Sequence, residues 1–67
     1  RITLKELAMK LSRQYNVQIR IASEALGSKA FRISLRNRET IGEVMKALQE
    51  IMPVTIEYKE DNIYIKE

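Results

Sequence analysis

The sequence contains no cysteine, histidine or tryptophan among its 67 residues. Without cysteine, the chain has neither disulfides nor thiolate metal ligands. Without histidine, it also lacks the side chain that most often serves as a general base and a common zinc ligand. Its two glycines, Gly27 and Gly42, are isolated, so no glycine-rich loop cradles a phosphate. We therefore expect binding rather than catalysis, and no metal or other cofactor.

The sequence also lacks long apolar runs. None approaches the ~20 residues that a membrane-spanning helix needs. The content of hydrophobic residues is 45%, and that of charged residues 31%, as in ordinary globular domains. The length predicts a single domain over residues 1–67. Since the chain begins with Arg1 rather than Met, we expect a piece of a longer protein in which part of a first strand is lost.

An internal repeat organises what is present. The pattern of residues 3–19 recurs 37 positions later, at residues 40–56. Each copy begins with Thr-x-x-Glu, continues with apolar residues at helical spacing, and ends in alternating apolar and polar residues. Thr-x-x-Glu is the capping box of a helix N-terminus, and strict alternation is typical of strands. The repeat therefore predicts a duplicated helix–strand unit.

The first copy predicts a helix over about 4–15 that ends at Asn16 in a left-handed conformation. A strand over 17–21 follows, and then a connection over 22–29 that is most flexible at Gly27-Ser28. A further strand over 31–35 points Phe31, Ile33 and Leu35 inward.

The second copy predicts a helix over about 41–52 with a wide apolar face that includes Ile51. Pro53 ends this helix and starts a strand in which Val54, Ile56 and Tyr58 point inward. Asp61-Asn62 is the expected two-residue hairpin turn, which pairs Glu60 with Ile63, Tyr58 with Ile65, and Glu57 with Lys66.

The predicted fold class is α+β, with the order (β)αββαββ and two helices packed with small mixed sheets. The predicted core consists of the inward-facing apolar residues: Leu4, Leu7, Leu11, Val17, Ile19, Ile21, Phe31, Ile33, Leu35, Ile41, Val44, Leu48, Val54, Ile56, Ile63 and Ile65.

Charge is unevenly distributed along the chain. Residues 1–38 carry nine Lys or Arg against two acids, and residues 39–67 carry three against seven. Arg20, Arg32 and Arg36 project from predicted strands and form one basic patch if those strands are neighbours. Such a patch would suit single-stranded nucleic acid, although it lacks the aromatic side chains on which bases stack. The alternatives are an oppositely charged protein, self-association, or solvated surfaces without a partner.

Protein binding through a sheet edge needs the least special chemistry. The terminal strand over 63–66 is short and carries Tyr64 on its outer face, so it could accept a further strand. Tyr64 and Lys66 are therefore candidate partner-binding residues, together with Arg20, Arg32 and Arg36. The competing interpretation is an exposed aromatic side chain beside a lysine that protects the edge.

Six stretches together form a distinctive pattern: Leu4-Lys5-Glu6-Leu7, Arg13-Gln14-Tyr15-Asn16-Val17, Phe31-Arg32-Ile33-Ser34-Leu35, Val44-Met45-x-x-Leu48, Met52-Pro53-Val54-Thr55-Ile56-Glu57-Tyr58 and Asp61-Asn62-Ile63-Tyr64-Ile65. They resemble the C-terminal domain of FecR-type anti-sigma factors of the Bacteroidetes, and the resemblance covers nearly the whole chain. A similar repeat occurs in the short signalling domain of TonB-dependent transducers and secretins, which is the alternative assignment. The junction Met52-Pro53 and the run from Arg13 to Val17 favour the anti-sigma version.

The resemblance implies a parent protein with a cytoplasmic sigma-binding segment, one transmembrane helix and a periplasmic part that ends in this domain. Its expected partner is the signalling domain of an outer-membrane TonB-dependent transporter of an iron complex or glycan. The expected output is control of an extracytoplasmic-function sigma factor. The related domains place two helices between two small sheets. Because the first strand is nearly absent from this chain, we expect one of the sheets to be incomplete or to be completed by a neighbouring molecule.

Overall fold

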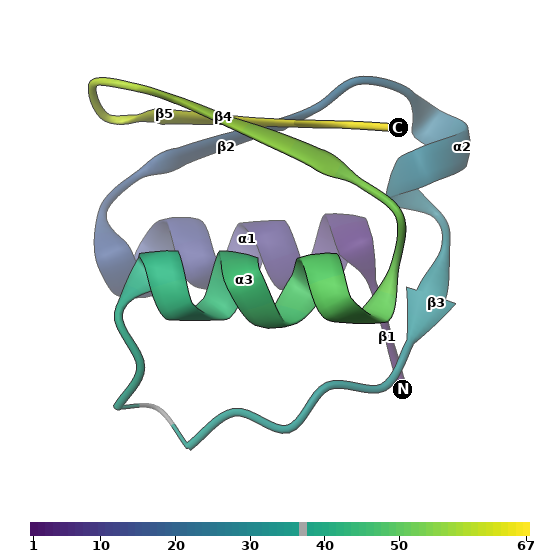
Figure 1. Cartoon of the computed structure of the whole chain (residues 1–67), viewed down its shortest axis with the longest axis horizontal. Helices are drawn as coiled ribbons and strands as arrows, with labels where there is room; N and C mark the ends of the chain where they lie inside the picture. Colours follow the sequence, from purple (N-terminus) through teal and green to yellow (C-terminus); the bar gives the residue numbers. More distant parts are fainter. Residues whose placement is uncertain (37) are drawn as a thin grey trace.

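The computed structural model describes residues 1–36 and 38–67, and it confirms an α+β fold (Figure 1). Two long helices lie side by side beneath a small sheet, and the extended segment after β3, described over residues 32–36 and 38–40, runs along the opposite side of the helices. The elements in chain order are β1 (Ile2–Thr3), α1 (Leu4–Tyr15), β2 (Gln18–Ile21), α2 (Glu24–Gly27), β3 (Ala30–Phe31), α3 (Ile41–Ile51), β4 (Thr55–Lys59) and β5 (Asn62–Lys66).

Both predicted capping boxes are present. The Thr3 hydroxyl accepts a hydrogen bond from the Glu6 amide at 3.2 Å, and the Glu6 carboxylate accepts one from the Thr3 amide at 3.0 Å. Thr40 and Glu43 make the same reciprocal pair at the start of α3. Asn16 ends α1 with φ 54° and ψ 47°, the left-handed conformation that asparagine tolerates better than most residues. Local sequence therefore determines where both long helices begin.

The sheet that covers the helices has the strand order β2-β5-β4. β5 pairs in parallel with β2 and antiparallel with β4. The prediction that the terminal strand forms an edge is therefore wrong, because β5 is central and the two edges are β2 and β4. An edge position was expected because β5 is the last strand of the chain. In the structure, β2, which is the strand of the first copy, pairs with the side of β5 that faces away from β4.

A second sheet consists of β1 and β3, whose two-residue pairing joins Ile2 to Phe31 and Thr3 to Ala30. The strand expected over 31–35 is thus shorter than predicted, since the chain from 32 to 36 has no strand assignment. The predicted alternation of faces nevertheless holds there. Ile33 and Leu35 pack against the core, whereas Arg32 and Arg36 are exposed.

The core lies around the helices, with the three-stranded sheet on one side and Phe31, Ile33 and Leu35 on the other. All sixteen residues predicted for it are either buried or packed against buried residues. The predicted core lacks three residues of the buried hydrophobic cluster, Met45, Met52 and Leu26. Leu26 is 1% exposed and lies on α2. Residues 22–29 were expected to be a connection, but Ser23 caps this one-turn helix through the Leu26 amide at 3.1 Å. The cap and the buried Leu26 together order the segment.

Three details of the second copy differ from the prediction. Ile51 is 42% exposed and Tyr58 is 56% exposed, although both were expected to face inward. The hairpin turns at Glu60-Asp61 rather than Asp61-Asn62, with positive φ at Glu60, so that Tyr58 pairs with Ile63. The expected ion pair between Glu57 and Lys66 is present at 3.3 Å, although these residues are diagonal rather than directly opposite. Among the described helices, none combines the length and apolar character needed to cross a bilayer.

Candidate binding groove

The outer edge of β2 leaves backbone groups of the sheet without a strand partner. The amides of Gln18 and Ala22 point toward β5, because they donate to Asp61 at 3.0 Å and Ile65 at 2.9 Å. Successive peptide groups of a strand point in alternate directions. The N–H and C=O groups of Ile19 and Ile21 therefore point away from β5. Within the described residues, no strand pairs with this side of β2.

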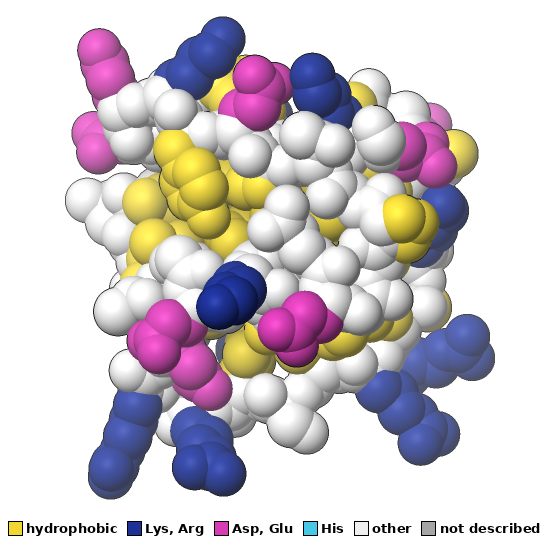
Figure 2. Space-filling model, viewed as in Figure 1, with side chains coloured by type: hydrophobic (Ala, Val, Ile, Leu, Met, Phe, Trp, Pro, Cys, Tyr) yellow, Lys and Arg dark blue, Asp and Glu magenta, His cyan; other side chains and the backbone are white. Residues whose placement is uncertain are grey.

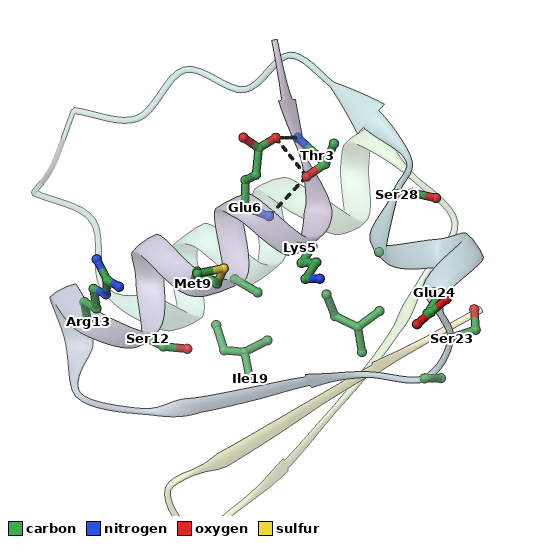
Figure 3. Close-up of a pocket in the computed structure, with 14 residues that line it drawn as sticks. Thr3, Lys5, Glu6, Met9, Ser12, Arg13, Ile19, Ser23, Glu24 and Ser28 are labelled. Carbon is green, nitrogen blue, oxygen red and sulfur yellow. Dashed lines mark hydrogen bonds between the residues drawn. The ribbon is translucent and has the colours of Figure 1, made fainter.

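A groove of about 1060 Å³ lies beside this edge, between α1, β2 and α2 (Figure 3). Ile19 and Ile21 line it from the strand, Met9 from α1, and Gly27 from α2. Met9 is 52% exposed, so its apolar side chain is open to solvent in the groove. The free edge of β2 and an exposed apolar side chain thus lie next to each other.

The position of Met9 follows from the helix period. The buried stripe of α1 contains Leu4, Leu7 and Leu11, and Met9 falls outside it. Lys5, Met9 and Arg13 are four residues apart, so they form a second line along the helix. Figure 3 shows this line facing the groove above β2, with Met9 between the two basic side chains. The sequence signal was therefore visible as one methionine flanked by cations at helical spacing, but sequence reasoning missed it.

The two acidic side chains that line the groove, Glu6 and Glu24, lie in the first turns of α1 and α2. Glu6 accepts hydrogen bonds from both the amide and the hydroxyl of Thr3, and Figure 3 shows its carboxylate turned toward that residue. The backbone amide of Thr3 is the main reason why the pKa of Glu6 lies below its ordinary value. Glu24 lies in the first turn of α2. Neither Lys5 nor Arg13 forms an ion pair with any described residue.

Two of the predicted partner-binding residues do come together, on the outer face of the three-stranded sheet. Arg20 and Tyr64 are partners in the β2–β5 register. The ammonium group of Lys59 lies 5.5 Å from the centre of the Tyr64 ring. Lys66 lies on the same face and is occupied by its ion pair with Glu57. This face is therefore a polar surface with one central aromatic side chain.

Arg32 and Arg36 do not join Arg20 in a single patch. The patch required β2 and the strand at 31–35 to be neighbours, but β2 pairs with β5, and β3 pairs with β1. The backbone amide of Arg36 instead donates to Glu39 at 2.8 Å. This bond is the main reason why the pKa of the Glu39 carboxyl is lowered. The hydroxyl of Tyr15 also donates to the Glu39 carbonyl, which ties the extended segment to α1.

The charge separation along the sequence is only partly a separation in space. Figure 2 shows Lys and Arg side chains projecting at the edge where the extended segment after β3 runs. Around the three-stranded sheet, basic and acidic side chains alternate on this view. On this face, the two signs of charge are therefore mixed around the sheet rather than divided into two halves.

The fold and the groove define a small α+β domain in which, among the described residues, the β2 edge of the sheet is unpaired and lies beside the line of Lys5, Met9 and Arg13. A family model described as FecR, C-terminal, matches residues 1–65 of this chain. The chain therefore belongs to the FecR family and represents the C-terminal domain of a FecR-type signalling regulator of the anti-sigma class. Searches of curated proteins and of solved structures found no match.

Proposed function

We propose that this domain is the periplasmic protein-recognition part of a transmembrane anti-sigma factor. It receives a signal from the signalling domain of a TonB-dependent outer-membrane transporter, and the parent protein passes the signal to an extracytoplasmic-function sigma factor. The domain acts by binding, without catalysis. The observation that carries the proposal is the match of the FecR C-terminal family to residues 1–65.

The structure supports a binding role in two ways. An edge strand with free backbone groups gives affinity through main-chain hydrogen bonds, while neighbouring side chains give selectivity. The outer sheet face adds Tyr64, and aromatic side chains are enriched where proteins recognise one another. Both surfaces belong to the three-stranded sheet, so one partner could engage either of them without unfolding the core.

A titration against the signalling domain of the cognate transporter tests the proposal. Signalling contacts are transient, and a dissociation constant of about 10 µM corresponds to about −7 kcal/mol, which calorimetry detects readily. We expect saturable one-to-one binding at or below this concentration. Absence of binding at about 100 µM, with both domains folded, would contradict the proposal.

The salt dependence of binding distinguishes the proposed function from the binding of nucleic acid. A titration with a single-stranded oligonucleotide at two salt concentrations is the matched control, because phosphate contacts weaken steeply as salt rises. We expect no saturable oligonucleotide binding at physiological salt. The binding of the transporter domain should weaken by no more than about tenfold between the two salt concentrations, since backbone and apolar contacts persist when salt screens its charge pairs.

A further inference from the structure

The unpaired edge of β2 and the line of side chains on α1 border the same groove. The edge presents the N–H and C=O groups of Ile19 and Ile21, for which no described strand provides partners. The line presents Lys5, Met9 and Arg13, which all line the groove. A strand added to β2 would therefore bring every second side chain over α1.

The spacing of the three side chains on α1 agrees with the spacing of alternate side chains on an added strand. Lys5 and Arg13 are eight helical residues apart, which corresponds to about 12 Å at 1.5 Å per residue. Side chains at positions i and i+4 of a strand share one face and lie about 13 Å apart at 3.3 Å per residue. The side chain at i+2 lies midway, where Met9 divides the helical line. A strand whose i and i+4 side chains are acidic and whose i+2 side chain is large and apolar would match all three groups.

We propose that this groove binds an extended acidic-x-apolar-x-acidic segment of a partner protein as a fourth strand of the sheet, beside β2. The two carboxylates pair with Lys5 and Arg13, and the apolar side chain covers Met9. The pattern reads the same in both directions, so it fits a parallel or an antiparallel strand. The inference deepens the proposed function, on which it rests, by naming the surface and the chemistry that the partner must offer.

Charge and sequence favour a partner protein over a second copy of this chain. The two basic groups are without ion-pair partners among the described residues, so an acidic segment gains contacts that a basic one would lack. In the chain itself, the required spacing occurs only at residues 39–43. Those residues form the capped start of α3, where Glu43 is held by Thr40, and so they are not an available strand.

The first experiment follows backbone amides in the whole 67-residue chain. The probe is the blocked peptide Thr-Glu-Thr-Leu-Thr-Glu-Thr, titrated to about 1 mM while amide hydrogen exchange is followed by NMR. We expect exchange of the Ile19 and Ile21 amides to slow by about tenfold or more at saturation. The Gln18 and Ala22 amides serve as internal controls, because they already donate to the carbonyls of Asp61 and Ile65. Absence of binding at 1 mM, or binding without protection of Ile19 and Ile21, would overturn the inference.

The second experiment reverses the two charges. The double variant Lys5→Glu, Arg13→Glu should bind the peptide about tenfold more weakly and should prefer Thr-Lys-Thr-Leu-Thr-Lys-Thr. The matched control is Arg38→Glu, Lys46→Glu, which changes the net charge equally at exposed positions outside the groove. The control should alter affinity by about twofold at most. Equal losses in both double variants would overturn the inference, because they would show attraction by overall charge alone.

Protection of Ile19 and Ile21 that grows with protein concentration, without any peptide, would also overturn it and indicate a second copy in the groove. The inference and the proposed function fail separately. If the transporter domain binds and the Lys5→Glu, Arg13→Glu variant binds it equally well, the groove assignment is wrong while the proposed function stands. If the peptide binds as described and the transporter domain does not, the proposed function is wrong while the groove assignment stands.

Discussion

Truncation of Leu48 tests where the core lies. Leu48 is 0% exposed on α3, and Leu48→Ala removes three carbon atoms from the buried side chain. At ~0.8 kcal/mol per buried methylene, the transfer term is about 2.4 kcal/mol, and the remaining cavity raises the loss to about 3 kcal/mol. A domain of this length has a free energy of unfolding of about 3–10 kcal/mol. The substitution should therefore remove a large part of the stability.

Ile51→Ala on the same helix is the matched control. It also removes three carbon atoms, but Ile51 is 42% exposed, so solvent already reaches much of the side chain. After allowing for exposure and for the better helix propensity of alanine, the expected loss is about 1 kcal/mol. Thermal unfolding followed by circular dichroism should show a fall of about 12–24 °C for Leu48→Ala and about 4–8 °C for Ile51→Ala. Equal losses would refute the assignment of Ile51 to the rim and Leu48 to the core.

Three further predictions concern ends and loops. Thr40→Ala removes the cap of α3 and should cost about 1 kcal/mol in urea unfolding, whereas Thr40→Ser should cost little; a loss below about 0.3 kcal/mol would contradict the role of the capping box. Asn16→Val places a β-branched residue at φ 54° and should lower the free energy of unfolding by about 1–3 kcal/mol, while Asn16→Gly should leave it nearly unchanged. Equal stability of the two variants in urea unfolding would contradict the left-handed conformation at the end of α1. Because the folded-state pKa of Glu39 is lowered, its contribution to stability is present above the unfolded value, near 4.5, and is lost as pH falls through the lower folded value. The melting temperature of the wild type should therefore fall more than that of Glu39→Gln on acidification, and parallel pH profiles would contradict the amide–carboxylate contacts.

Sequence predicted the long helices well because their ends are encoded locally. The bounds of α1 agree with the prediction, and Thr3 and Asn16 act as expected. The helix α2 was missed because a single turn with one buried apolar side chain, Leu26, has no measurable period. Capping by Ser23 was the only available signal for it.

The pairing of strands could not be predicted in the same way. Alternation specifies which face a residue occupies, but it does not specify which strand lies beside it. The predicted and observed hairpin registers differ by two residues and leave Tyr58 and Ile63 on the same face. The choice of Asp61-Asn62 rested on residues that tolerate positive φ, but Glu60 adopts it instead. The central position of β5 depends on contacts between distant segments.

The candidate site was predicted only in part for the same reason. Arg20 and Tyr64 meet because β2 and β5 pair, which sequence did not indicate. Arg32 lies elsewhere because the chain leaves the sheet after β3. Met9 carried a sequence signal, but its meaning depended on finding β2 at an open edge beside it.

The central claim is that this FecR C-terminal domain recognises a transporter's signalling domain through the edge of β2. The most direct measurement is amide hydrogen exchange of the 67-residue chain with and without that domain at saturating concentration. The account predicts slowed exchange at Ile19 and Ile21, with little change at Gln18 and Ala22. Binding of the transporter domain without any added protection of Ile19 and Ile21, or no binding at all, would contradict it.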